Sequence, residues 1–107
     1  MAGVVEIRTY KLLAGSGAEF HRLVVEDSLP MLERWGVDVL AYGASLDDPD
    51  LYYLVRAYPS LEELQQSQDA FYGSDEWRDG PREAIVSVIE SSICVVLPAG
   101  SLLFGDT

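Results

Sequence analysis

Two arginines and three tyrosines stand at positions where the alternation of a β-strand gives them a common side. They are Arg8, Tyr10, Tyr42, Arg56 and Tyr58. On one face of a sheet, the guanidinium groups can hold a carboxylate or an enolate, while the tyrosine hydroxyls donate hydrogen bonds to a developing oxyanion. The competing interpretation is structural. In it, the arginines pair with Glu6 and Asp38 across adjacent strands and the tyrosines fill the core of a dimer.

His21 is the only histidine, and histidine is the side chain whose ordinary pKa lies nearest neutrality. A general base of that kind, or an axial haem ligand, would have to be this residue. It falls at the edge of the apolar stripe of an expected helix, which is also typical of an exposed histidine without a chemical role. No second histidine or cysteine stands at metal-ligand spacing, so the sequence predicts no metal site.

The cysteine and the two tryptophans have structural interpretations. Cys94 lies in an apolar strand, where a free cysteine behaves as a small buried hydrophobe. Trp35 is expected to face the core, and Trp77 to fill a sheet edge or a dimer seam, with stacking on a ligand as the alternative. The sequence contains no G-x-S-x-G, G-x-G-x-x-G or Walker pattern, and it predicts no organic cofactor.

Composition sets limits on the class of protein. The 107 residues predict one domain over 1–107, with a core over 4–97 and a tail over 98–107. Seven basic and 18 acidic residues give a formal charge of −11, which disfavours nucleic-acid binding. The longest apolar run, 93–97, is too short to cross a membrane. With no visible secretory signal and a single cysteine, we expect a cytoplasmic protein.

Apolar periodicity predicts the pattern strand, helix, strand twice in succession. The expected strands cover 4–11, 37–42, 51–58 and 92–97, with a turn over 47–50 between the second and third. Capping boxes at Ser16 and Ser60 mark the starts of two helices. The first helix is expected to kink or restart at Pro30 and to end at Gly36, and the second loosens at Gly73. Short helices are expected at 74–77 and 81–89.

This element order, βαββαβ, is that of the ferredoxin-like α+β fold, a four-stranded antiparallel sheet with both helices on one face. The side expected to face the helices is apolar and consists of Val5, Ile7, Val37, Val39, Leu51 and Val55. The other side contains Glu6, Arg8, Tyr10, Asp38, Tyr42, Tyr52, Arg56 and Tyr58. That mixture suits the lining of a cavity closed by a second sheet. A register shift of one residue would exchange the two sets, so the sequence alone leaves this choice open.

Four segments in order resemble the NIPSNAP family. They are Val5–Tyr10, Glu19–Glu33, Tyr53–Glu63 and Ser74–Trp77, within a similarity that runs from Val4 to Ser92. The resemblance implies a dimeric α+β barrel, in which two ferredoxin-like sheets enclose a central cavity. It supplies no catalytic motif to transfer. Related barrels include cofactor-independent monooxygenases, haem-dependent enzymes and isomerases, which is an analogy of fold alone.

We therefore expect a homodimer that binds a small aromatic or anionic molecule, with oxygenation, isomerisation or cyclisation as candidate reactions. The expected catalytic residues are His21, Arg56 and Tyr58, and the expected substrate-binding residues are Arg8, Tyr10, Tyr42 and Trp77. Two alternatives remain: a non-catalytic binding or structural module whose lumen is packed with its own side chains, and a haem binder that uses His21.

Overall fold

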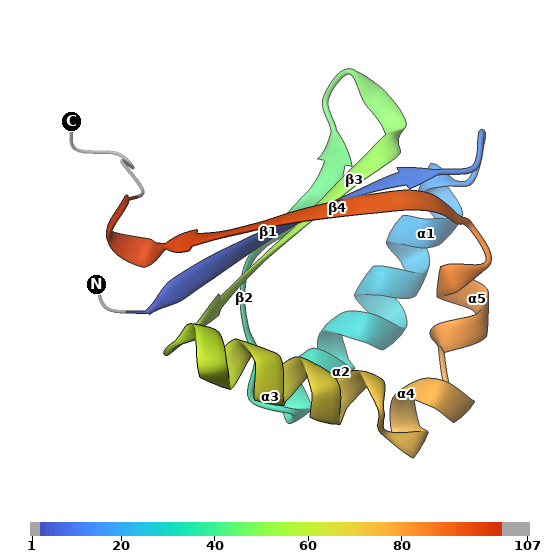
Figure 1. Ribbon diagram of the computed structural model, residues 1–107. Helices are drawn as coiled ribbons and strands as arrows, with labels where there is room; N and C mark the ends of the chain where they lie inside the picture. Colours follow the sequence, from blue (N-terminus) through green and yellow to red (C-terminus); the bar gives the residue numbers. More distant parts are fainter. Residues whose placement is uncertain (1–2, 102–107) are drawn as a thin grey trace.

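The computed structural model describes residues 3–101 and contains a four-stranded antiparallel sheet with the α-helices on one side (Figure 1). The strands are β1 (Val4–Leu12), β2 (Asp38–Ser45), β3 (Asp48–Tyr58) and β4 (Ile89–Pro98). Their order in the sheet is β2-β3-β1-β4, so β1 and β3 are central and β4 is an edge strand. This confirms the predicted α+β class and the ferredoxin-like arrangement. Residues 102–107 of the predicted tail lie outside the described residues.

The first helical region has three parts. It consists of α1 (Gly17–Leu23), the π-helical turn η1 (Val24–Ser28) and α2 (Leu29–Arg34). Pro30 is the second residue of α2 and has no N–H to donate, so a regular α-helical hydrogen bond to the carbonyl of Glu26 is impossible. The wider π-turn lies directly before it, in agreement with the predicted restart at Pro30. Gly36 follows with a φ of +75°, which favours glycine.

Serine hydroxyls cap the first two helices of the second helical region. The second region comprises α3 (Leu61–Tyr72), α4 (Asp75–Asp79) and α5 (Arg82–Val86). Ser60 accepts a hydrogen bond from the backbone N–H of Glu63, and Ser74 accepts one from Trp77. Both hydroxyls therefore satisfy N–H groups that a helix start leaves without partners. The prediction that α3 begins at Ser60 is confirmed.

The predicted capping box at Ser16 is wrong. The Ser16 hydroxyl donates to the carbonyl of Leu13 instead, and Glu19 pairs with Arg22. The carboxylate of Asp50, at the start of β3, accepts from the backbone N–H groups of Gly15 and Gly17, both at 2.9 Å. A residue 33 positions away in the chain thus caps α1, which a local sequence pattern cannot reveal.

Several predicted boundaries differ from the structure. The turn between β2 and β3 is Leu46–Asp47, and residues 48–50 belong to β3 rather than to the turn. The helix predicted for 81–89 is only α5, and Ile89 already belongs to β4. Leu61, the first residue of α3, is exposed. Trp35, predicted to face the core, is 38% exposed and donates through Nε1 to Glu76.

The assignment of the two faces of the sheet was wrong. The side toward the helices carries Glu6, Arg8, Tyr10, Leu12, Tyr52, Leu54, Arg56 and Tyr58, as register and burial show. The other side, here called the open face, carries Val5, Ile7, Thr9, Leu51, Tyr53, Val55, Ala57, Ile93, Val95 and Leu97. The polar set can lie beneath the helices because its charges and hydroxyls satisfy one another. Only Val37 and Val39 of the predicted apolar set pack against the helix-side core.

The core lies between the sheet and the helices. Its buried members include Phe20, Leu32, Leu54, Phe71 and Trp77, with Tyr10 and Tyr72 packed against them. Among residues 3–101, none of the helices combines the length and the apolar character that a membrane crossing requires.

Candidate functional site

Two arginines share one carboxylate beneath the helices. Arg56 donates from Nε and Nη2 to Glu6 Oε1 at 2.9 and 2.6 Å, and Arg8 Nη2 donates to Glu6 Oε2 at 2.9 Å. Gln68, from α3, donates to Glu6 Oε2 at 3.0 Å and accepts from Arg8 at 3.3 Å. The hydroxyl of Tyr72 accepts from Arg56 Nη1 at 2.9 Å. The result is a hydrogen-bonded cluster in which Glu6 and Arg56 are each 1% exposed.

Burial and charge set the protonation of this cluster. Burial acts to raise the pKa of Glu6, but Arg56, Gln68 and Arg8 outweigh it, so this pKa lies below its usual value. Burial also raises the pKa of Tyr10 to about 12, and it raises that of Tyr58, whose hydroxyl accepts a hydrogen bond from Gln68. Near neutral pH, Glu6 is therefore ionised and both phenols keep their protons.

The charges of the cluster do not balance. Two guanidinium groups face one carboxylate, and among the described residues neither arginine pairs with a second acid. Arg8 Nε is buried without a hydrogen-bond partner in the same part of the chain. A buried charge normally has a partner of opposite sign, and a buried N–H normally has an acceptor. Arg8 thus offers a positive charge and a donor for which residues 3–101 supply no second acceptor.

Arg8 is partly open to solvent. The side chain of Arg8 is 22% exposed, whereas that of Arg56 is 1% exposed. Cys94 lies directly opposite Arg8 in the register of β1 and β4 and is exposed. The predicted burial of Cys94 is therefore wrong. The helices make their main sheet contacts with β2 and β3, and most of β4 is exposed.

An aromatic cavity of about 40 Å³ adjoins the cluster through Tyr72. Tyr10, Tyr72 and Trp77 line it, and the ring centroids of Tyr72 and Trp77 are 5.3 Å apart. The predicted binding residues Tyr10 and Trp77 are thus brought together, and Tyr72 joins them to Arg56. The space suits a water molecule and is too small for an aromatic ring, since a 150 Å³ cavity is known to hold benzene.

His21 and Tyr42 lie apart from the arginines. His21 is exposed on α1, its ring is stacked on Tyr42 with centroids 6.2 Å apart, and its Nδ1 is 2.7 Å from the hydroxyl of Tyr52. Tyr52 lines the same small cavity, so it connects His21 to the interior. The contacts of His21 within the described chain provide no direct bond to Arg8 or Arg56. Haem binding through His21 stays a prediction.

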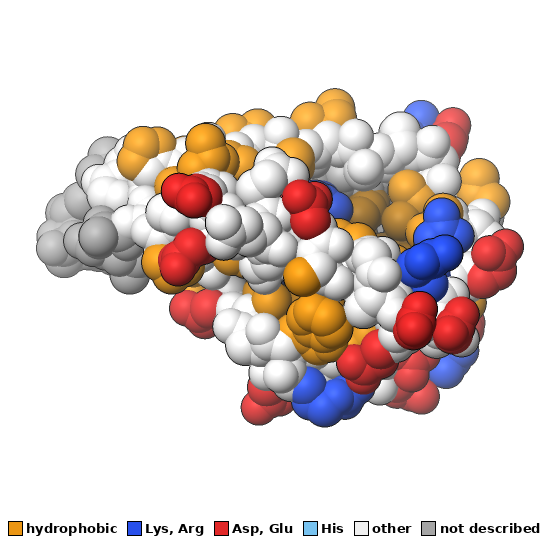
Figure 2. All heavy atoms as spheres, turned by 60° about the horizontal axis from the view of Figure 1, so that its bottom comes forward, with side chains coloured by type: hydrophobic (Ala, Val, Ile, Leu, Met, Phe, Trp, Pro, Cys, Tyr) orange, Lys and Arg blue, Asp and Glu red, His pale blue; other side chains and the backbone are white. Residues whose placement is uncertain are grey.

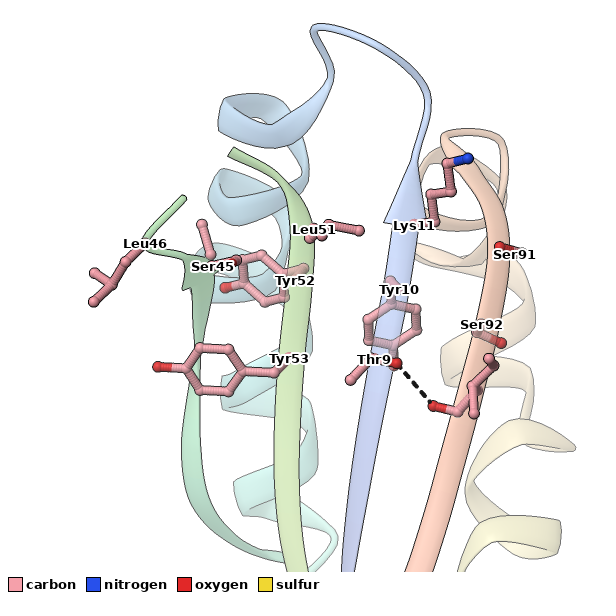
Figure 3. A pocket seen from close by; sticks show the side chains of 12 residues that line it. Thr9, Tyr10, Lys11, Ser45, Leu46, Leu51, Tyr52, Tyr53, Ser91 and Ser92 are labelled. Atoms are coloured by element: carbon pink, nitrogen blue, oxygen red, sulfur yellow. Dashed lines mark hydrogen bonds between the residues drawn. The ribbon is translucent and has the colours of Figure 1, made fainter. Parts of the chain in front are cut away.

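A larger hollow of about 910 Å³ lies over the open face, near the turn between β2 and β3 (Figure 3). Its wall includes Leu51, Tyr53 and Ile93, and Thr9 donates to the carbonyl of Ile93 at 3.2 Å. This hollow is separate from the arginine cluster because the two lie on opposite sides of the sheet. The arginines predicted to line a dimer cavity therefore do not face this side.

Sequence reasoning missed Gln68 and Tyr72 as site residues. Gln68 stands four positions after the buried Leu64 on α3, where an apolar side chain is expected. A polar residue at such a position is the one available signal of a buried polar partner. The prediction that the arginines pair with Glu6 is confirmed, because Glu6 pairs with both of them. Pairing with Asp38 is not found: Asp38 is exposed and forms no ion pair within the described part of the chain.

Comparisons with known proteins identify the fold. No protein-family model matches the sequence, and no curated protein is significantly similar to it. A NIPSNAP family protein from Agrobacterium tumefaciens has a TM-score of 0.81 at 21% identity, covering 91% of this chain and 85% of that one. This chain has the NIPSNAP fold. An uncharacterized NIPSNAP domain protein from Burkholderia xenovorans gives 0.76 at 21% identity, covering 88% and 91%.

A protein with a provisional enzyme description has a similar fold. A protein from Bordetella bronchiseptica is provisionally described as an antibiotic biosynthesis monooxygenase. Its structure has a TM-score of 0.72 at 18% identity, covering 91% of this chain and 96% of that one. The resemblance predicted from four sequence segments is thereby confirmed for the fold. Within residues 3–101, no group of three or more His, Cys, Asp or Glu side chains is placed to hold a metal ion.

Proposed function

We propose that this chain binds a small organic acid on the helix side of its sheet, with the carboxylate or enolate of the ligand on Arg8. The proposal rests on the uneven charge of the cluster, which contains two arginines and one carboxylate. It rests also on Arg8 Nε, which is buried without a hydrogen-bond partner among the described residues. An incoming anion would supply the missing acceptor, and charge-assisted hydrogen bonds are among the stronger ones in proteins.

The body of the ligand would lie toward β4, because the cavity next to Tyr72 is too small to hold a ring. Cys94 and Val96 are exposed on that side, and the aromatic ring of Tyr72 lies 5.9 Å from the guanidinium carbon of Arg8. An anionic head at Arg8 with an apolar or aromatic body along the edge strand therefore matches the available surface. This would place the ligand within one chain rather than in a dimer lumen.

The same groups suit the activation of a substrate as its enolate or phenolate. Arg8 and Arg56 would stabilise the negative charge, and Tyr10, protonated at neutral pH, is available as a hydrogen-bond donor in the adjoining cavity. Such an anion is the species that oxygenation, isomerisation and cyclisation without a cofactor have in common. Oxygenation is the first reaction to test, because a protein provisionally described as a monooxygenase has a similar fold.

The binding test uses benzoate as the probe and two matched variants. We expect Arg8→Gln to weaken benzoate binding by about 10- to 100-fold, the range expected for loss of a charged hydrogen bond. Arg22→Gln, which changes an exposed arginine on α1, should bind as the wild type does. Chemical shifts in an NMR titration give both affinities.

The proposal is overturned if the two variants bind benzoate equally well. It is also overturned if the wild type binds no benzoate up to about 10 mM, a concentration that corresponds to very weak affinity. A second readout uses Cys94, the only cysteine. Benzoate should slow its reaction with a thiol reagent in the wild type and leave the rate unchanged in Arg8→Gln.

A further inference from the structure

The cavity of about 40 Å³ beside Tyr72 lies within the core between the sheet and the helices. All the residues that line it are buried except Tyr10, Ser28 and Tyr72, which are half-buried. Voids of this size are few in a close-packed protein interior, and each of them lowers the stability of the fold. A void at this place in a small core is therefore a candidate binding site.

The wall of the cavity consists mostly of carbon. Aromatic rings and branched aliphatic side chains form most of it. The Tyr52 hydroxyl is 2.7 Å from His21 Nδ1, and the Tyr72 hydroxyl accepts from Arg56 Nη1 at 2.9 Å, so both already have a partner. A buried water normally makes about three hydrogen bonds, whereas apolar cavities stay dry. The cavity has room for a molecule as small as water, but its wall favours one that needs no hydrogen bonds.

The size of the cavity restricts its occupant to a molecule of few atoms. Its volume of about 40 Å³ is slightly larger than the roughly 30 Å³ that a water molecule takes up in the liquid. An apolar diatomic molecule falls in this range, and its burial leaves no hydrogen-bonding group unsatisfied. Val24 and Ser28 of the π-helical turn η1 form part of the wall, and such turns are frequent at functional sites.

The cavity lies close to the surface through Phe71 and Trp35. Phe71 lines the cavity, and Trp35 packs edge-on against it with ring centroids 5.5 Å apart. Trp35 is itself 38% exposed. On the helix side of the molecule, hydrophobic side chains reach the surface among the charged ones (Figure 2). Exposed side chains change rotamer within nanoseconds, so such motions can admit a small uncharged molecule.

The cavity also adjoins the groups that would hold the organic acid. The ring of Tyr72 lines the cavity and lies 5.9 Å from the guanidinium carbon of Arg8 and 5.8 Å from that of Arg56. Tyr10 lines the cavity as well, and Arg8 is close enough to act on the charge of its phenol. Little more than one aromatic ring therefore separates a molecule in the cavity from a ligand on Arg8.

We propose that this cavity binds dioxygen and holds it next to the organic acid on Arg8. Dioxygen is diatomic and apolar, and it is the co-substrate that an oxygenation would consume. The use of the oxygen rests on the proposed function, whereas its binding in the cavity can be measured with no ligand on Arg8.

The first test uses dioxygen itself as the probe. Dioxygen is paramagnetic and speeds the NMR relaxation of nearby protons, so relaxation under oxygen is compared with relaxation under argon at the same pressure. In the wild type, the methyl groups of Leu54 and Ile85 should gain more relaxation under oxygen than those of Val5, which is also buried but lies outside the cavity. Equal gains would overturn the proposal. A long-lived water signal at the cavity methyl groups that persists under oxygen would overturn it as well.

Two neighbouring valines provide matched variants. Val24→Ile adds a methylene to the wall of the cavity and should abolish the additional relaxation at Leu54 and Ile85. Val25→Ile makes the same change at a side chain that is 41% exposed and should keep the relaxation of the wild type. Ser28→Thr adds a methyl group from the same turn and is a second way to fill the cavity, with circular dichroism to confirm that each variant is folded. Additional relaxation that survives in both Val24→Ile and Ser28→Thr overturns the assignment to this cavity.

A titration with benzoate under oxygen separates this inference from the proposed function. The aromatic protons of bound benzoate should gain more relaxation under oxygen in the wild type and in Val25→Ile than in Val24→Ile. If benzoate binds and this difference is absent, dioxygen does not lie beside the ligand, and the inference fails while the proposed function stands. If the cavity methyl groups respond to oxygen but benzoate does not bind, the proposed function fails and the role of dioxygen as a co-substrate fails with it.

Discussion

Removal of the shared carboxylate should strongly destabilise the fold. In Glu6→Met, Arg56 would stay 1% exposed with Tyr72 as its remaining partner, and Arg8 would keep only Gln68. Leaving one member of a buried ion pair without its partner costs about 3–5 kcal/mol. For 107 residues this corresponds to a fall in Tm of roughly 13–22 °C. The total free energy of unfolding of such a chain is only about 5–16 kcal/mol.

Replacing both buried partners should recover most of that loss. In Glu6→Met/Arg56→Met, no fully buried charge stays unpaired, and apolar pairs of similar volume are often as stable as buried ion pairs. Glu19→Met removes an exposed carboxylate that is paired with Arg22 and should cost far less than Glu6→Met, because solvent screens an exposed ion pair. Urea unfolding of the four proteins gives the free energies. The reasoning fails if Glu6→Met costs no more than Glu19→Met, or if the double variant is as unstable as Glu6→Met.

Three further predictions concern other parts of the chain. Because the folded-state pKa of Glu6 lies below 4.5, its stabilisation is present above that pH and is lost as the pH falls through the lowered pKa; urea midpoints should show a flatter acid dependence for Glu6→Gln than for the wild type. Asp50→Ala should lower the unfolding free energy by about 1 kcal/mol and Ser16→Ala by much less, measured by urea unfolding, because Asp50 caps α1; equal effects would contradict this. Cys94 should react with a thiol reagent in the folded protein nearly as fast as in urea, and slow labelling of the folded protein would show that another part of the chain or a partner covers β4.

Much of the fold was predictable because its signals are local. Alternating apolar residues identified all four strands, and the serine at position 60 identified the start of α3. Pro30 indicated the break in the first helical region. The start of α1 was misread because its cap, Asp50, comes from a distant strand. Periodicity within one segment carries no information about such a contact.

The site was predicted in part. Arg8, Arg56, Tyr10 and Tyr58 do share one face, as their spacing requires. Which face meets the helices depends on whether the polar side chains can satisfy one another, and here Gln68 on α3 completes that network. The apolar character of the other face, taken alone, favoured the opposite assignment of the two faces. Exposure of Cys94 was missed for a similar reason, because the sequence does not show how far the helices extend across the sheet.

The contacts between Asp50 and the start of α1 make the hairpin and that helix one mechanical unit. A Cβ atom added at Gly17 would come within 1.9 Å of the carbonyl oxygen of Pro49, so the two segments are in direct backbone contact. A side chain at position 17 would clash with this carbonyl, so either the start of α1 or the base of the hairpin would have to move. A substitution at Gly17 would therefore disturb the cap of α1 and the base of the hairpin together.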